Sequence, residues 1–171
     1  MNQAFSNYLR QTESAHRLGN DTEHTHRPAL KALLENLNDE ITATNEPKRI
    51  ACGAPDLVIT RNNDGLIIGH VEAKDVGVSL DEAAKSEQIK KRYLPALPNF
   101  ILTDYLEFRW FVDGSLRDHF RIAKVHANGS LIVDDAACGK AERLLKEFLS
   151  RALIRIESAD ELGKCLDLGA G

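Results

Sequence analysis

Cysteine is scarce in this sequence, and long apolar runs are missing. The three cysteines, Cys52, Cys138 and Cys165, lie far apart and form no C-x-x-C pair. This spacing excludes a disulfide framework and a cysteine-rich zinc site, and it fits a reducing compartment. No segment approaches the roughly 20 apolar residues of a membrane span, and the N-terminal segment has no signal-peptide core. We therefore expect a cytoplasmic protein with no membrane partner.

An excess of positive charge is also missing. The formal net charge is −4, whereas an isolated nucleic-acid-binding protein usually carries a basic excess, because phosphate neutralisation drives its affinity. If DNA or RNA is the partner, the basic surface must be local, or another domain or chain must supply it. The 171 residues suffice for one compact domain with a core. The proportions of apolar and charged residues are those of a globular protein.

Two helices are predicted in the N-terminal part. Residues 3–18 carry apolar side chains at helical spacing, and "LGND" ends that segment. The next segment has one apolar face, made of Leu30, Leu33, Leu34 and Leu37. Because proline is tolerated only within the first turn of a helix, Pro28 predicts that the regular helix begins near His26. Glu23 would then lie just before the helix or in a distorted turn.

Strand and turn signals dominate the middle of the chain. Residues 57–60 and 66–74 flank the turn signal Asp64-Gly65, which predicts a hairpin. Ser79 and Glu82 have capping-box spacing, so we expect a helix over about 80–93 that Pro95 and Pro98 end. "NFILT" follows as a strand, and "LEFRWFV" and "LRDHFRIAKV" flank the turn "DGS" as a second hairpin.

The C-terminal part completes an α/β pattern. "HANGSLIV" predicts a turn and one more strand, and a long amphipathic helix follows. Ser158 with Glu161 is expected to cap a short last helix. The order of elements predicts an α/β domain around a mixed β-sheet flanked by helices. We expect a single domain over residues 1–171, with a core at about 20–133 and C-terminal helices at about 136–168.

Three charged residues stand on the otherwise apolar first hairpin. Asp56 precedes the turn residue Asp64 by eight positions, and Glu72 follows it by eight. A tight hairpin therefore places the two carboxylates opposite each other, and Lys74 shares a face with Glu72. Opposed carboxylates repel unless a cation lies between them, and Mg²⁺ prefers such ligands. With a lysine beside the ion, these groups suit metal-assisted phosphodiester hydrolysis.

A plainer interpretation of the same residues stays open. Asp56 can cap a turn after Pro55, and Glu72 with Lys74 can form an ion pair that faces solvent on an edge strand. Charged pairs of this kind protect a sheet edge from aggregation.

The segments Pro55-Asp56 and Glu72-Ala73-Lys74 resemble the PD-(D/E)xK motif of the restriction-endonuclease-like nuclease superfamily. Three longer stretches look like the N-terminal cleavage region of single-chain restriction–modification proteins that carry an adenine methyltransferase. They are "EHTHRPALKALLENL", "ATNEPKRIACGAPDLVI" and "GHVEAKDVG…SEQIKKRYLPALPNFILTDYLEFRWF". The resemblance covers about residues 20–115.

The resemblance implies a restriction-endonuclease-like core with a catalytic β-hairpin, acting as a DNA endonuclease with Mg²⁺, or Mn²⁺ as a substitute. It implies Asp56 and Glu72 as metal ligands, with Ala73 between the acid and the lysine included in the metal-binding set. Lys74 becomes the catalytic lysine. Related nucleases often add a glutamate from an N-terminal helix, for which Glu23 is the candidate.

Some of these nucleases also carry a Gln and a Tyr spaced QxxxY after the lysine. This chain has Gln88 and Tyr93, with one residue more between them. Gln88 is a candidate site residue that hydrogen-bonds a phosphate or the water, or else an ordinary polar helix position. A step of five does not return to the same face of an α-helix, which leaves Tyr93 in doubt.

Several other features carry weaker signals. Lys85, Lys90, Lys91 and Arg92 make the densest basic stretch and can grip phosphates or form a solvated face. His24 and His26 form an H-x-H pair with little support for zinc. The aromatic side chains of residues 108–111 can stack on bases or fill the core. The terminal "LDLGAG" imitates the glycine-rich loop of an S-adenosylmethionine domain.

DNA is thus the expected partner, with a methyltransferase or translocase domain or chain as a further one. The sequence leaves the oligomeric state open. Two alternatives also stay open: a non-catalytic nucleic-acid-binding or assembly module that retained the nuclease fold, and a DNA-repair or junction nuclease of the same superfamily.

Overall fold

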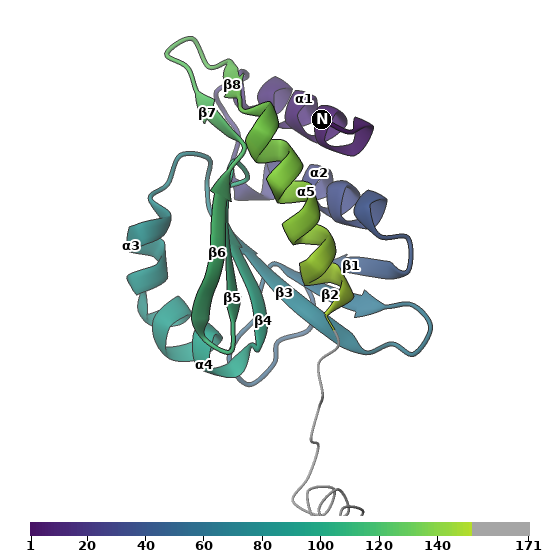
Figure 1. The fold of residues 1–171 in the computed structure, drawn as a ribbon. Helices are drawn as coiled ribbons and strands as arrows, with labels where there is room; N and C mark the ends of the chain where they lie inside the picture. The colour runs from purple at the N-terminus through teal and green to yellow at the C-terminus, as the bar shows by residue number, and fades with distance from the viewer. Residues whose placement is uncertain (152–171) are drawn as a thin grey trace, which may run out of the picture.

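A computed structural model describes residues 1–151 of the chain (Figure 1). Its elements in chain order are α1 (Gln3–His16), α2 (Glu23–Leu37), β1 (Ile41–Asn45), β2 (Leu57–Arg61), β3 (Ile67–Ala73), α3 (Leu80–Lys85), the π-helix η1 (Gln88–Tyr93), α4 (Leu94–Ala96), β4 (Asn99–Thr103), β5 (Glu107–Val112), β6 (Ser115–Arg121), β7 (Ala123–Val125), β8 (Leu131–Val133) and α5 (Asp135–Ser150). The predicted last helix at Ser158 and the "LDLGAG" segment lie outside the described residues.

Six strands form one mixed sheet in the order β1-β2-β3-β4-β5-β6. Strands β3 and β4 run parallel, and all other neighbours in this sheet run antiparallel. Strands β7 and β8 form a separate antiparallel pair. The predicted α/β fold with a mixed sheet and a β2–β3 hairpin is therefore confirmed, and β3 lies in the interior of the sheet.

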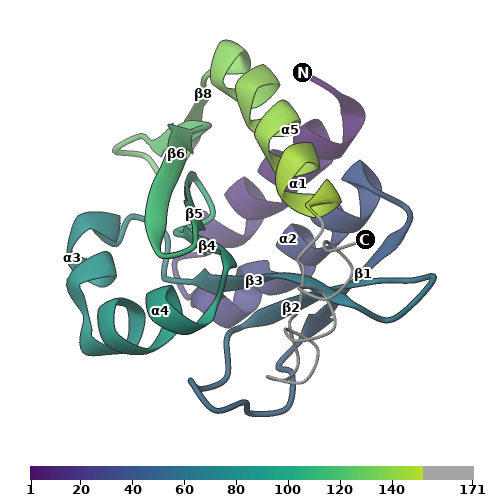
Figure 2. The ribbon, with the colours of Figure 1, turned by 60° about the horizontal axis from the view of Figure 1, so that its bottom comes forward.

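Helices cover both faces of the sheet, which makes three layers (Figures 1 and 2). Helices α1, α2 and α5 lie on one face and share the larger apolar core with it. Helices α3, η1 and α4 lie on the other face, where Leu80, Ile89, Tyr93 and Leu97 pack against strand residues. Both predicted leucine-rich helix faces point into the larger core, because only this side of each helix is apolar.

The start of α2 corrects a prediction. The helix begins at Glu23, three residues before the expected position, and Pro28 lies inside it. Pro28 has no N–H to donate to the carbonyl of His24. The first turn is held by a local capping box, in which the N–H of Thr22 donates to Thr25 Oγ1 at 3.1 Å, and by a tertiary contact, since the backbone N–H of Glu23 donates to Asp75 Oδ1 at 2.7 Å. The contact with Asp75 cannot be read from local sequence, whereas the Thr22–Thr25 capping box is a local signal.

The predicted single helix over about 80–93 consists of two pieces, α3 and η1, and α4 follows beyond it. Ser79 caps α3 as predicted by accepting a hydrogen bond from the N–H of Glu82, but α3 ends at Lys85. The chain then continues as the π-helix η1, followed directly by α4. Pro95 lies within α4, which ends before Leu97 and Pro98.

Strand β1 was not predicted. Its residues alternate between buried and exposed positions, with Ile41 and Ala43 in the core. Phe108, Trp110 and Phe111 of β5 are buried, so the interpretation that they stack on bases is wrong and the core interpretation holds. Within the described part of the chain, no helix is long and apolar enough to cross a membrane.

Candidate functional site

The β2–β3 hairpin brings three charged residues to one end of the two strands. Leu57 pairs with Val71 in the antiparallel register, so Asp56, which precedes β2, lies opposite Glu72. A bulge in β3, where Ile68 is the extra residue, shifts the register only nearer to the turn. Glu72 belongs to β3 and Lys74 follows this strand directly.

The two carboxylate oxygens of Asp56 accept hydrogen bonds from different parts of the structure. Oδ2 accepts a hydrogen bond from the backbone N–H of Ala73 at 2.8 Å, and Oδ1 accepts one from the guanidinium of Arg27. These partners lie on β3 and α2, so the side chain does not act as a local cap after Pro55. Ala73 thus takes part through its N–H, and the carbonyl of Ala73 as a metal ligand stays a prediction.

Only one of the two carboxylate oxygens of Glu72 accepts a hydrogen bond. Oε1 accepts a hydrogen bond from Lys74 Nζ at 2.8 Å, while Oε2 is buried and has no hydrogen-bond partner within residues 1–151. Burial, and next the charge of Asp56, raise the pKa of Glu72 to about 6, although Lys74 opposes the shift. Glu72 is 5% exposed on an interior strand, so the solvent-facing edge pair is wrong.

Lys74 carries a stable positive charge at the rim of this site. Burial lowers the pKa of Lys74, but the hydrogen bond to Glu72 and the charges of Glu72, Glu23 and Asp56 outweigh it, so the pKa lies above its ordinary value. The backbone N–H of Lys74 donates to the carbonyl of Thr103 at 2.8 Å, which fixes its position beside β4. The side chain is 24% exposed and can therefore reach a ligand from solvent.

Arg27 is a site residue that the sequence analysis missed. Its guanidinium is buried and hydrogen-bonds Glu23 at 3.1 Å, Glu46 at 3.2 Å and Asp56. Glu23 and Arg27 are four residues apart and share a helix face only because α2 begins at Glu23. The expectation that the regular helix begins near His26 concealed this pairing. A Glu-x-x-x-Arg spacing on the correct helix boundary is the signal that would have revealed it.

Glu23 is held beside the hairpin by its own backbone. Its N–H donates to Asp75, one residue after Lys74, and its carbonyl accepts a hydrogen bond from the hydroxyl of Tyr105. The side chain of Glu23 contributes to the raised pKa values of Glu72 and Lys74, which places it in their electrostatic neighbourhood. The structure therefore brings Glu23 together with the hairpin residues.

Gln88 and Tyr93 contact each other because of the π-helix. Nε2 of Gln88 donates to the hydroxyl of Tyr93 at 2.9 Å. A π-helix closes its hydrogen bonds from i to i+5, so a step of five returns to the same face. The sequence analysis placed Tyr93 on a different face from Gln88 because it assumed an α-helix, and that assumption is wrong.

The hydroxyl end of Tyr93 packs at Gly53, where a side-chain Cβ atom on residue 53 would lie 3.0 Å from that oxygen. Burial raises the pKa of Tyr93, with smaller contributions from the charges of Glu72 and Asp56. The Gln88–Tyr93 pair therefore borders the hairpin site.

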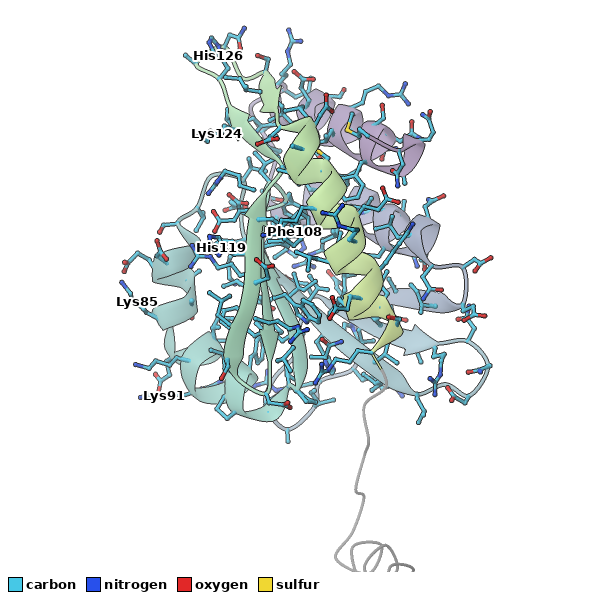
Figure 3. All side chains as sticks on the ribbon, in the orientation of Figure 1. Lys85, Lys91, Phe108, His119, Lys124 and His126 are labelled. Atoms are coloured by element: carbon cyan, nitrogen blue, oxygen red, sulfur yellow. The ribbon has the colours of Figure 1, made fainter. Side chains whose placement is uncertain are left out.

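The basic stretch of the α3–η1 layer is partly neutralised. Lys85 pairs with Glu82 at 2.8 Å, and Lys91 pairs with Glu87 at 3.1 Å. Lys85 and Lys91 project outward from this layer, away from the sheet (Figure 3). The use of these lysines as phosphate contacts stays a prediction.

The predicted H-x-H pair does not converge. His26 is buried and its Nε2 lies 2.6 Å from Asp21. His24 is mostly exposed, with ring nitrogens 3.9 Å from Glu23 and 3.7 Å from Glu46. A zinc site made by His24 and His26 together is therefore wrong.

The donors at the hairpin fit a hard divalent cation by their chemistry. Glu72 Oε2 is buried without a proton donor, and the carboxylates of Asp56 and Glu23 lie in the same neighbourhood. Oxygen ligands of this kind are those that Mg²⁺ takes, commonly one or two carboxylates with the remaining positions left to water or phosphate. A cation at Oε2 would satisfy the orphaned acceptor and offset the repulsion between Glu72 and Asp56.

No protein-family model matches the chain, and no curated protein matches it. Among solved structures, it is similar to a chain in the cryo-EM structure of a DrdV–DNA complex, with a TM-score of 0.68 over 88% of this chain at 20% sequence identity. This chain spans 14% of the length of that neighbour. The likeness shows a shared fold.

Proposed function

We propose that the chain is a metal-dependent DNA endonuclease domain of the PD-(D/E)xK type, the cleavage domain of a restriction–modification system. The observation that carries the proposal is the orphaned, buried Oε2 of Glu72, opposite Asp56 and beside the positive charge of Lys74. Most buried acceptors in folded proteins have a donor, so a buried carboxylate oxygen without one calls for an explanation such as a bound ion.

Each residue of the site has a role in this proposal. Asp56 and Glu72 hold the cation, with the carbonyl of Ala73 as a further donor and Glu23 approaching from α2. Mg²⁺, or Mn²⁺ in its place, supplies Lewis-acid polarisation and a more acidic water when bound. Lys74 holds a positive charge against the scissile phosphate and orients the attacking water. Gln88 donates to a phosphate oxygen from the rim.

The fold likeness supports DNA as the substrate, because the neighbour's structure is a complex with DNA. The neighbouring chain is several times longer than this one, which supports a division of labour. In the proposal, a methyltransferase or translocase domain or chain supplies sequence specificity and most of the DNA affinity. This division also accounts for a cleavage domain with a net charge of −4.

The test compares wild type with Lys74→Ala and Asp56→Ala on supercoiled plasmid DNA with Mg²⁺ or Mn²⁺ at low ionic strength. Wild type should nick DNA with little sequence preference. Asp56→Ala should lose metal binding and cleavage together, because it removes a ligand. Lys74→Ala should abolish cleavage and keep most metal binding by calorimetry, because lysine is not a ligand.

Equal nicking by wild type and Lys74→Ala would reject the proposal, since the activity would then come from a contaminant. Failure of wild type to cleave with Mg²⁺ or Mn²⁺, even in the presence of a partner methyltransferase or translocase, would favour a non-catalytic DNA-binding module with the same fold.

A further inference from the structure

A second group of metal-ligand side chains lies where α1 and α2 meet. His16 is the last residue of α1, Asp21 lies in the connecting loop, and His26 belongs to α2. The three residues are spaced five apart in sequence, and the connecting loop folds them onto one point. None of them is a proposed ligand of the hairpin site.

The ligand atoms of this His16–Asp21–His26 cluster converge closely. Oδ2 of Asp21 lies 3.0 Å from Nδ1 of His16 and 2.6 Å from Nε2 of His26. One donor atom from each residue lies within 4.8 Å of the other two. Two imidazoles therefore aim a nitrogen at the same carboxylate oxygen.

We propose that His16, Asp21 and His26 bind a transition-metal ion of the zinc class, which joins the end of α1 to the first turns of α2. Two histidines and one carboxylate are a common ligand set for Zn²⁺, with a fourth position left for water. Ligands at about 2.1 Å in tetrahedral geometry lie about 3.4 Å apart, so the side chains need to separate by less than an ångström from the distances seen here. The proposal is independent of nuclease activity.

The cluster is closed off on the side of the protein core and open to solvent on the opposite side. His26 is 1% exposed, and its ring packs on Tyr105 with the centroids 5.1 Å apart. Asp21 is 11% exposed and His16 is 23% exposed, so an ion enters and keeps its water on the side of His16. Two imidazole nitrogens favour a borderline metal over Mg²⁺, which prefers oxygen.

The two sites should therefore select different ions. The hairpin offers only oxygen ligands, and the His16–Asp21–His26 cluster offers two nitrogens and one oxygen. An ion at this cluster would also fix the loop that precedes Glu23, so it would stabilise the start of α2. This effect is on structure and can be measured without any DNA.

The experiment is a titration of the metal-stripped full chain with Zn²⁺ in excess Mg²⁺, followed by calorimetry, and with Co²⁺, followed by its visible absorption. His16→Ala and Asp21→Asn are the test variants, since both side chains are partly exposed and their loss should not unfold the protein. His24→Ala is the matched control, because His24 is exposed near the same helix start and lies outside the cluster. Asp56→Ala tests independence from the hairpin.

Wild type, His24→Ala and Asp56→Ala should bind one Zn²⁺ per chain with similar affinity and show a tetrahedral Co²⁺ spectrum. His16→Ala and Asp21→Asn should bind at least about a hundredfold more weakly, since loss of even an outer partner of a ligand costs about 10–100-fold. Zn²⁺ should raise the melting temperature of the first group and not of the second. Equal zinc affinity in wild type and His16→Ala would overturn the proposal. Absence of zinc binding by wild type would also overturn it, and the cluster would then be a hydrogen-bonded triad only.

Discussion

Two clusters of buried or half-buried charge lie on the same sheet, and only one is internally complete. The hairpin cluster consists of Glu23, Arg27, Asp56, Glu72 and Lys74. The β5–β6 cluster consists of Asp104, Glu107, Arg109 and Arg121. Each combines acids with basic side chains, so sequence composition alone does not distinguish them.

The β5–β6 cluster satisfies its acceptors. Glu107 Oε1 accepts from Arg109 Nε at 2.8 Å, and Oε2 accepts from Arg121. Asp104 Oδ1 accepts from the backbone N–H groups of Leu106 and Glu107, and Oδ2 accepts from Gly77. Every carboxylate oxygen of these two acids therefore has a donor, and nothing further is needed to hold the charges in place.

The hairpin cluster leaves Glu72 Oε2 without a donor. Burial raises the pKa of Glu72 to about 6 and also raises the pKa of Asp104, so the missing donor, and not the pKa, distinguishes the two clusters. A fold keeps a buried acceptor unsatisfied at a cost of about 1–3 kcal/mol. The contrast is the one expected if the β5–β6 charges serve stability and, as we propose, the hairpin charges hold a ligand. Substitutions in the two clusters should therefore differ in their effects on cleavage, on stability and on its pH dependence.

The largest expected effect concerns cleavage by matched variants of the two clusters. Lys74→Met should reduce the rate by about 10²–10³-fold, because it removes a preorganised charge at the reacting group. Arg109→Met removes a base from the β5–β6 cluster and should leave the rate near that of wild type when assayed below its melting temperature. Plasmid nicking under single-turnover conditions measures both. Similar losses in the two variants would mean that the clusters do not differ in function.

The second effect concerns stability and has opposite signs in the two clusters. Glu107→Gln should destabilise the fold by about 3 kcal/mol, the lower end of the range for a broken buried pair, because Arg121 is partly exposed. Glu72→Gln should stabilise the metal-free protein, because it removes a buried charge with an orphaned oxygen. Urea unfolding with EDTA at neutral pH measures both changes. Destabilisation by Glu72→Gln would contradict the distinction.

The third effect is the pH dependence of the stability difference between Glu72→Gln and wild type. The pKa of Glu72 is about 6 in the folded chain against an ordinary value of 4.5. Between these values the unfolded chain has lost the proton and the folded chain keeps it, so the contribution of Glu72 to stability falls as pH rises. The full loss above pH 6 is about 2 kcal/mol. The stability gap between Glu72→Gln and wild type in EDTA should therefore vanish below pH 4.5 and open toward pH 6. A gap that does not vary with pH would exclude a raised pKa.

The sequence predicted the fold class and the hairpin because those depend on local signals. Asp64-Gly65 and the alternating apolar residues around it specify the hairpin, and residues 56 and 72 fall opposite each other by counting alone. The start of α2 was missed because Pro28 was taken to mark the first turn, although Thr22 and Thr25 form a local capping box there and Asp75 adds a contact from a distant part of the chain. The same error concealed the contact of Arg27 with Glu23.

Two further features depended on information that local patterns do not contain. The break of the predicted helix at Lys85 and the π-helix after it turn Tyr93 toward Gln88, and neither follows from propensity. The His16–Asp21–His26 cluster depends on how α1 packs on α2, so the adjacent pair His24 and His26 was the misleading local signal.

The smallest expected effect lies at the rim of the hairpin cluster, where Gln88 donates to the hydroxyl of Tyr93. Tyr93→Phe removes one neutral hydrogen bond, worth about 1 kcal/mol, and keeps the buried ring. It should lower cleavage a few fold and lower the melting temperature by only about 2–4 °C. A double-mutant cycle with Gln88→Ala measures whether the two residues act together: if the π-helix presents them as a unit, the double variant should lose no more than the more damaging single variant. Fully additive losses would show that Gln88 acts at the site without Tyr93, and the π-helix would then serve packing alone.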